Sequence, residues 1–161
     1  EDAVAIKDTA EIDVEACIGC GECVTVCPTD AIESDWEAEI GPFMERMTEQ
    51  AYGSIKDKKD KVGYINFVLN ITPDCDCVPW SDAPIVRDIG ILASKDPVAI
   101  DKASYDLVNQ QQGFENSLLE ANFAPEEDKF KGLRDYTKGQ IQINYGAEIG
   151  LGDKDYELVE L

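Results

Sequence analysis

Alternating apolar and polar residues predict a strand pair at the start of the chain. Residues 4–6 and 12–14 alternate on either side of a polar turn near residues 7–9. A period of two residues is typical of a strand with one face turned toward the protein. We therefore expect a short β-hairpin within residues 1–15.

Helical spacing of apolar residues dominates the middle of the chain. It predicts helices over residues 42–56 and 96–113, the second with Asp96 as its N-cap and a proline in its first turn. Shorter helices are expected at residues 116–123 and 126–134.

One segment near the C-terminus fits two patterns. Ile141, Ile143 and Tyr145 alternate as in a strand, but Ile141, Tyr145 and Ile149 also fit one face of a helix that ends at Gly150. We choose the helix for residues 140–149.

Three segments have the composition of strands. Residues 62–71 alternate and are rich in β-branched and aromatic side chains, residues 85–93 predict a buried strand, and residues 156–161 predict a closing strand. Together with the helices they predict a mixed α/β layer over residues 35–161, preceded by a small module at residues 1–34.

Four cysteines give that small module its chemistry. Cys17, Cys20, Cys23 and Cys27 lie in CIGCGECVTVCP, which has the C-x2-C-x2-C-x3-C-P spacing of bacterial iron-sulfur ligands. Glycines between the first three cysteines permit tight turns, and the proline ends the short helical turn before it. The pattern predicts a 4Fe-4S cluster, whereas the alternative is buried or disulfide-bonded cysteine.

Charge narrows the range of partners. The formal net charge is −20, and residues 1–45 hold 13 acidic side chains against one lysine, a balance of −12. Such a field repels nucleic acid and anionic membranes, favours a basic redox partner and lowers a cluster's potential. Simple solubility, or adaptation to salt or heat, explains the same imbalance.

Two further features of composition exclude classes of function. The chain has no histidine, which excludes Rieske ligation, histidine-based zinc sites and imidazole catalysis. No apolar run approaches the roughly 20 residues of a membrane span, so we expect no transmembrane helix. Oxygen-sensitive cluster chemistry and reduced thiols suggest the cytoplasm of an anaerobic microbe.

A short internal sequence repeat links the module to two-cluster ferredoxins. Residues 29–32 (TDAI), which follow the last cysteine and its proline, are similar to residues 1–4 (EDAV). Residues 1–34 thus resemble the second half of a two-cluster bacterial ferredoxin, in which the fourth cysteine of each run ligates the other cluster. This resemblance implies that Cys27 serves a second cluster, with its other ligands in a further cysteine run before Glu1. We therefore expect a longer protein, or an oligomer partner, to complete the fold.

A second resemblance covers most of the chain. The segments FVLNITPDCDC (67–77), DAPIVRDIGILASKDPVAIDKASYDLVN (82–109) and AEIGLGDKDYELVEL (147–161) resemble the C-terminal portion of the domain-of-unknown-function 362 iron-sulfur family. The family joins ferredoxin-type cysteine runs to an α/β domain. The resemblance carries no assigned reaction.

Two more cysteines form a second candidate site. Cys75 and Cys77 alternate with Asp74 and Asp76 in a proline-punctuated loop, so the two thiols share one side of an extended segment. They could ligate metal or a cluster. They could equally be reduced bystander thiols beside turn-forming aspartates.

Two functions remain compatible with these patterns. The first is an electron-transfer module whose α/β part docks onto an oxidoreductase. The second is an enzyme whose cluster feeds a substrate or metal site in the loop 74–77. The sequence has no phosphate-binding loop or dinucleotide fingerprint to support the second, and we favour the first.

Overall fold

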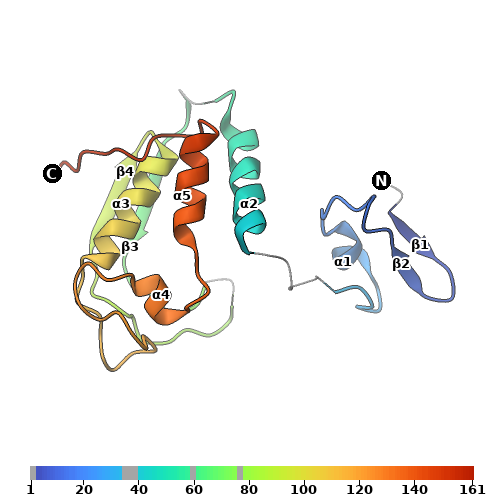
Figure 1. Ribbon diagram of the computed structural model, residues 1–161, viewed down its shortest axis with the longest axis horizontal. Coiled ribbons are helices and arrows are strands. Elements are labelled where there is room, and N and C mark those ends of the chain that lie inside the picture. The colour runs from blue at the N-terminus through green and yellow to red at the C-terminus, as the bar shows by residue number, and fades with distance from the viewer. Residues whose placement is uncertain (1–2, 34–39, 59–60, 76–77) are drawn as a thin grey trace. The chain divides into compact units, whose positions relative to one another are not determined.

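A computed structural model describes residues 3–33, 40–58, 61–75 and 78–161 (Figure 1). The chain divides into two compact units, Glu1–Ala38 (unit 1) and Glu39–Leu161 (unit 2). The boundary predicted between residues 34 and 35 lies outside the described residues.

Unit 1 contains a hairpin and one short helix. Strand β1 (Val4–Ile6) pairs antiparallel with β2 (Ala10–Ile12), which confirms the predicted hairpin, and α1 spans Glu22–Val26. In the described part of this unit, Ala3 is the sole buried residue, whereas Ile6 and Val26 are 86% and 67% exposed. Unit 1 therefore has too little buried apolar surface to explain its fold.

Unit 2 combines helices with one antiparallel strand pair. Its helices are α2 (Ile40–Ile55), α3 (Pro97–Asn109), α4 (Lys129–Leu133) and α5 (Gly139–Glu148). Strand β3 (Tyr64–Val68) pairs with β4 (Gly90–Ser94). The helices predicted at 42–56, 96–113 and 140–149 are confirmed with small shifts of their ends, while α4 covers only part of the segment predicted at 126–134.

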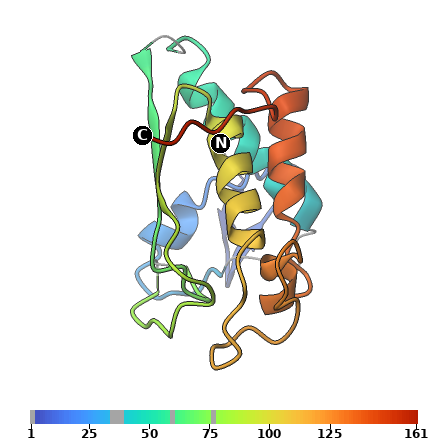
Figure 2. The same ribbon diagram turned by 90° about the vertical axis from the view of Figure 1, so that its left-hand side faces the viewer.

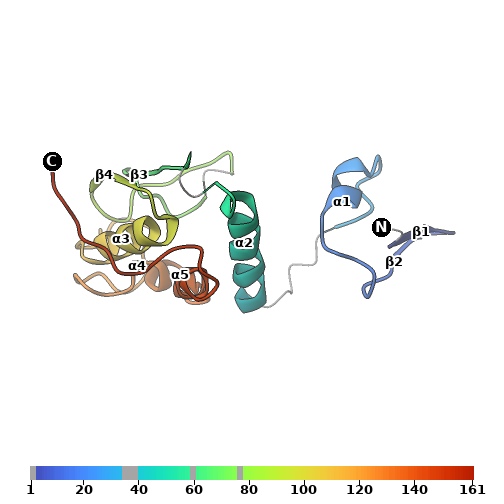
Figure 3. The same cartoon turned by 90° about the horizontal axis from the view of Figure 1, so that it is seen from above.

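The strand pair, α3 and α5 form successive layers of unit 2, and α2 packs against α5 (Figures 2 and 3). Alternate residues of β3 face α3. The Asn66 amide donates hydrogen bonds to side chains of that helix, and Val68 packs in one cluster with Val108. The other face of the pair is apolar but open: Ile65, Phe67 and Ile91 are 61%, 67% and 59% exposed. The buried strand predicted at 85–93 is therefore wrong in part, since Ile85 and Val86 are buried before the strand begins and β4 itself is half-open.

Two apolar clusters stabilise unit 2. The first cluster joins β3, α3 and the long loops. It consists of Val68, Ile85, Val86, Val108 and Leu119. The other joins α3 and α5 to the segment that follows: Val98, Ile143 and Leu151. Gly146 lies where three elements meet, because a Cβ there would approach Val98 to 3.0 Å and Thr48 to 3.5 Å. A glycine at this point lets α5 pack closely.

Local hydrogen bonding explains one wrong prediction. Residues 116–123 form turns rather than a helix, because the Ser117 hydroxyl donates to the Phe114 carbonyl and accepts from the Leu119 amide. Serine side chains compete in this way with helical backbone bonds. Asn122 also adopts a left-handed φ of 59°, which a helix does not allow.

The predicted closing strand at residues 156–161 is also wrong. These residues form no regular element, and Leu158 and Leu161 are exposed rather than packed. Tyr156 instead anchors the segment by donating a 3.0 Å hydrogen bond to Asp106 on α3.

The fold class is mixed α and β, as predicted, with two small antiparallel sheets in the described residues. Within that part of the chain, no helix has the length and apolar character needed to cross a bilayer.

Candidate iron-sulfur site

The four cysteines of the CIGCGECVTVCP loop (residues 17–28) occupy one continuous turn-and-helix segment. The loop begins with a 2.9 Å hydrogen bond from the Cys17 N–H to the Asp13 carbonyl, just after β2. Gly19 and Gly21 have φ values of 68° and 73°, and helix α1 starts immediately afterwards. Left-handed backbone is strained for other residues, so the glycines are what let the chain turn twice within five residues.

These two glycines are needed for their backbone conformation and not to avoid a steric clash. A Cβ placed on Gly19 or on Gly21 would meet no atom within 4 Å. Larger side chains would therefore be disfavoured at these two positions by their backbone angles and not by a steric clash.

Helix α1 fixes the spacing of the second cysteine pair. Cys23 lies within its first turn and Cys27 is its C-cap, with the extended angles φ −68° and ψ 114°. The Val24 and Thr25 amides both donate to the Gly21 carbonyl, which closes that first turn. The helix ends at Cys27 because the next residue is proline.

The Cys27 sulfur has polar neighbours that the sequence pattern did not reveal. The Ala31 N–H donates to Cys27 Sγ at 3.3 Å, and the Thr29 hydroxyl lies 3.6 Å from the same atom. Hydrogen bonds from Thr29 and then Ala31 lower the pKa of the Cys27 thiol to about 7. The arrangement depends on the turn after Pro28, where Asp30 takes a left-handed φ of 50°. The sequence signals this turn only through Pro28 and Asp30, which are residue types that favour turns.

The donor set fits a cluster, although the thiols do not form a ready-made cage. Cys17 and Cys20 are exposed, Cys23 and Cys27 are half-buried, and none of the four is in a disulfide. Within the described residues, no group of three or more His, Cys, Asp and Glu side chains is close enough together to hold a metal ion. Four cysteine sulfurs in one glycine-containing loop, none of them in a disulfide, are nevertheless the donors that iron-sulfur clusters use.

The second candidate site is described only in part. Cys75 is exposed, and Asp76 and Cys77 lie outside the described residues. Asp74 forms an ion pair with Arg134, with 3.3 Å between Oδ1 and Nη2, so this carboxylate has a structural partner. A shallow cavity of about 350 Å³ adjoins the loop, and its walls are formed by Thr72, Asp74, Cys75, Val78, Pro79, Trp80 and Ser81.

Comparison with known proteins identifies the family. The family model described as Domain of unknown function (DUF362) matches residues 17–106, which begin at Cys17 and run into α3. No curated protein and no solved structure matches the chain. The match covers more than half of the sequence and includes the whole cysteine run. The chain therefore belongs to the domain-of-unknown-function 362 family.

Proposed function

We propose that this protein is an iron-sulfur electron-transfer protein. In this proposal Cys17, Cys20, Cys23 and Cys27 supply the thiolates for a 4Fe-4S cluster, and the protein passes single electrons to or from a partner oxidoreductase. The observation that carries the proposal is the loop itself. Its four cysteines form no disulfide, two left-handed glycines separate the first three, and the described part of the unit has almost no buried apolar surface.

The weak core of unit 1 supports a structural role for the cluster. Protein units of this size that lack a core are usually held by disulfides or bound metal. The described cysteines of unit 1 form no disulfide. Binding free energy from iron-sulfur ligation would then contribute directly to folding, as it does in small metal-dependent domains.

The residues around Cys27 favour the ligand form of its sulfur. Metal and cluster ligands must be deprotonated, and the Ala31 N–H and Thr29 hydroxyl stabilise the thiolate of Cys27. A bound 4Fe-4S cluster supplies one-electron redox chemistry whose potential depends on such hydrogen bonds and on nearby charge. The negative charge of the acidic residues in this region should lower the reduction potential of such a cluster.

The number of clusters is part of the proposal. In two-cluster ferredoxins a cysteine in the position of Cys27 ligates the neighbouring cluster. We propose the same role here, with the remaining ligands supplied by sequence before Glu1 or by an oligomer partner. The apolar face of the β3–β4 pair is open within unit 2, and sheet faces of this kind are normally covered by further protein, either another part of the chain or a partner.

The charge of the chain suggests the kind of partner. A net charge of −20 favours a redox partner with a basic docking surface. We propose the cytoplasm of an anaerobic organism as the compartment, because 4Fe-4S chemistry is sensitive to oxygen and the cysteines of the loop form no disulfide. Electron transfer to such a partner should slow as salt screens the interaction. A rate that stays constant from low to high ionic strength would argue that the charge serves solubility alone.

A cavity beside Cys75 supports an alternative function as an enzyme. The cavity beside Thr72 and Cys75 lies next to the loop 74–77, where a substrate or metal could reach a thiol. The ion pair of Asp74 with Arg134 weakens this alternative, because it occupies one of the candidate carboxylates. Replacement of Cys75 by serine tests for a metal site in this loop: loss of bound metal would favour the alternative, whereas unchanged metal content would leave the thiol without a ligand role.

The direct test of the proposed function is spectroscopic. Protein purified without oxygen should show a 4Fe-4S signal by electron paramagnetic resonance after chemical reduction, and reoxidation should remove it. A protein that takes up iron but cannot be reduced and reoxidised reversibly would refute an electron-transfer role.

A further inference from the structure

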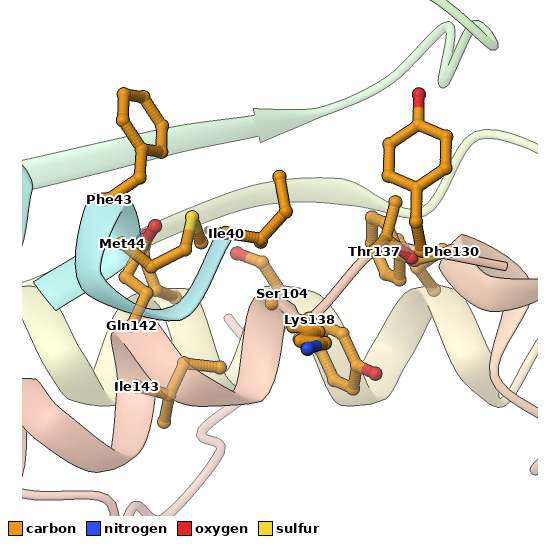
Figure 4. A pocket seen from close by; sticks show the side chains of 14 residues that line it. Ile40, Phe43, Met44, Ser104, Phe130, Thr137, Lys138, Gln142 and Ile143 are labelled. Carbon is orange, nitrogen blue, oxygen red and sulfur yellow. Dashed lines mark hydrogen bonds between the residues drawn. The ribbon is translucent and has the colours of Figure 1, made fainter. Parts of the chain in front are cut away.

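A cavity in unit 2 lies apart from the cysteine loop in the sequence and has the properties of a ligand site. Its volume is about 430 Å³, within the range of small-molecule pockets (Figure 4). Helix α2 contributes Ile40, Phe43 and Met44, and α5 contributes Gln142 and Ile143. The remaining walls come from α3, α4 and the segment between α4 and α5.

Aromatic rings form much of the wall. Tyr105 and Phe130 stack with ring centroids 4.8 Å apart and planes 8° from parallel. The Tyr105 hydroxyl donates a 2.6 Å hydrogen bond to Asp128, which fixes that ring. Phe43 and Tyr136 add two more rings to the lining. The fixed Tyr105–Phe130 pair suits a flat apolar ligand, and the faces of aromatic rings also attract cations.

One carboxylate gives the cavity its polarity. Asp101 of α3 lines it, and both carboxylate oxygens are fixed: Oδ1 accepts from Asn66 Nδ2 at 3.2 Å and Oδ2 accepts from Gln142 Nε2 at 3.0 Å. Both donors are neutral amides. Of the ion pairs in the described part of the chain, none involves Asp101, so its negative charge has no cationic partner there.

Around Asp101 and Ser104, the hydrogen-bonding capacity that remains is mainly that of the carboxylate acceptor sites. A carboxylate offers about four acceptor sites, and the protein uses two of those on Asp101. The Ser104 hydroxyl already donates to the Ile100 carbonyl and accepts from Asn66, so it has no proton left for a ligand. In Figure 4 the side chains of Ile40 and Met44 lie on the α2 side of Ser104. A ligand must therefore bring donors to this end of the cavity.

Lys138 is the other charged residue of the lining and has the opposite sign. It is exposed, so water screens its charge, whereas Asp101 is half-buried. Interactions of a half-buried charge are screened less. The field inside the cavity is therefore set mainly by Asp101.

We propose that this cavity binds a small organic cation: a flat apolar or aromatic body that carries a protonated amine. The body packs against the aromatic wall, and the ammonium group donates to the free acceptor sites of Asp101. This proposal does not depend on the cysteines, so its failure would leave the electron-transfer proposal untouched.

The methionines provide the readout. The chain has two, of which Met44 lines the cavity and Met47, on the same helix, does not. With ¹³C-methyl methionine in the full chain, tryptamine as the probe should shift the Met44 signal saturably and leave the Met47 signal in place. A Met47→Leu variant assigns the two signals.

Charge dependence completes the test. Indole-3-propionate, which has the same ring and the opposite charge, should bind at least tenfold more weakly than tryptamine. Asp101→Asn should weaken tryptamine binding at least tenfold, while the control Asp155→Asn, an exposed residue outside the lining, should not. The proposal is overturned if Met44 shows no saturable shift at millimolar tryptamine, if the anionic probe binds equally, or if folded Asp101→Asn binds as well as the wild type. The two-probe comparison needs no variant and therefore decides the question even if Asp101→Asn fails to fold.

Discussion

The carboxylate of Asp96 accepts a 2.8 Å hydrogen bond from the backbone N–H of Asp153, a residue 57 positions further along the chain. Its other oxygen caps α3 by accepting from the amides of Val98 and Ala99 at 2.8 and 3.0 Å. One side chain thus fixes both the start of α3 and the path of the C-terminal segment. Gly152 makes this contact possible, because a Cβ there would lie 2.0 Å from Asp96 Oδ1.

Replacing Asp96 by alanine should lower the free energy of unfolding by about 1–2 kcal/mol through loss of the cap alone. Loss of the bond to Asp153 should add to this and expose the amide of that residue to hydrogen exchange. Urea unfolding measures the first effect, with Asp155→Ala as the control. Gly152→Ala should produce a similar loss, and the double variant should be less destabilised than the sum of the two. Strict additivity would show that the two residues do not act through one contact.

Lys129 is fully buried, and its ammonium group donates to three backbone carbonyls, those of Asn109, Ala124 and Glu127. Burial lowers its pKa, so the fold accommodates the charge only because these oxygens surround it. Lys129→Met should destabilise unit 2 by about 1–3 kcal/mol, because the carbonyls lose a charged donor. Lys131→Met is the matched control on the same helix, since that residue is exposed and its pairing with Asp128 is worth little. Equal stability of the two variants would contradict a structural role for Lys129.

Because the pKa of Tyr105 is raised in the folded state, we expect the protein to lose stability at high pH. Burial, and then its hydrogen bond to Asp128, raise the pKa of Tyr105 to about 12. The folded state holds this proton more tightly than the unfolded chain, whose tyrosines titrate near pH 10. The contribution is therefore complete below about pH 10 and is lost as the pH rises toward 12.

Absorbance titration can isolate this group. Tyr145 also has a pKa of about 12, because it donates to Glu49, so the titration belongs in a Tyr145→Phe background. In that background Tyr105→Phe should remove the last tyrosine to ionise before unfolding. If the latest step persists, Tyr105 is not the group with the raised pKa.

Removal of the cluster should affect the two units differently. Unit 1 has one buried residue in its described part, whereas unit 2 has two apolar clusters. Chelation of iron under reducing conditions should therefore abolish amide protection in β1, β2 and α1 and leave α3 protected. Hydrogen exchange followed by mass spectrometry measures both. Retained protection in unit 1 would mean that its fold does not depend on iron.

Local signals in the sequence were sufficient for several elements. Asp96 followed by a proline predicted the start of α3, and the structure confirms its two capping bonds. The helix over residues 140–149 could be chosen over a strand because its apolar positions continue at helical spacing to Ile149, which packs in the second apolar cluster. These features depend on residues within a few positions of one another.

Features that depend on distant residues could not be predicted. Nothing near Lys129 indicates that it is buried, because its carbonyl partners include Asn109, 20 residues earlier. The strand predicted at 156–161 needed to pair with another strand, and in the structure it joins neither of the two sheets of the described residues. The cavity lined by Asp101 escaped the sequence analysis for the same reason, since its walls run from Ile40 to Ile143. The neighbours of the Cys27 sulfur depend on the turn after Pro28, which the spacing of the cysteines does not specify.

The most direct test of a cluster on the cysteine loop is the iron and acid-labile sulfide content of protein purified without oxygen. It should be measured for the wild type, for Cys20→Ser and for Cys75→Ser, the same substitution in unit 2. We expect about four irons and four sulfides per cluster in the wild type, retention of both in Cys75→Ser, and loss of both in Cys20→Ser. A Cys20→Ser protein that is folded and keeps its full iron and sulfide would contradict the assignment.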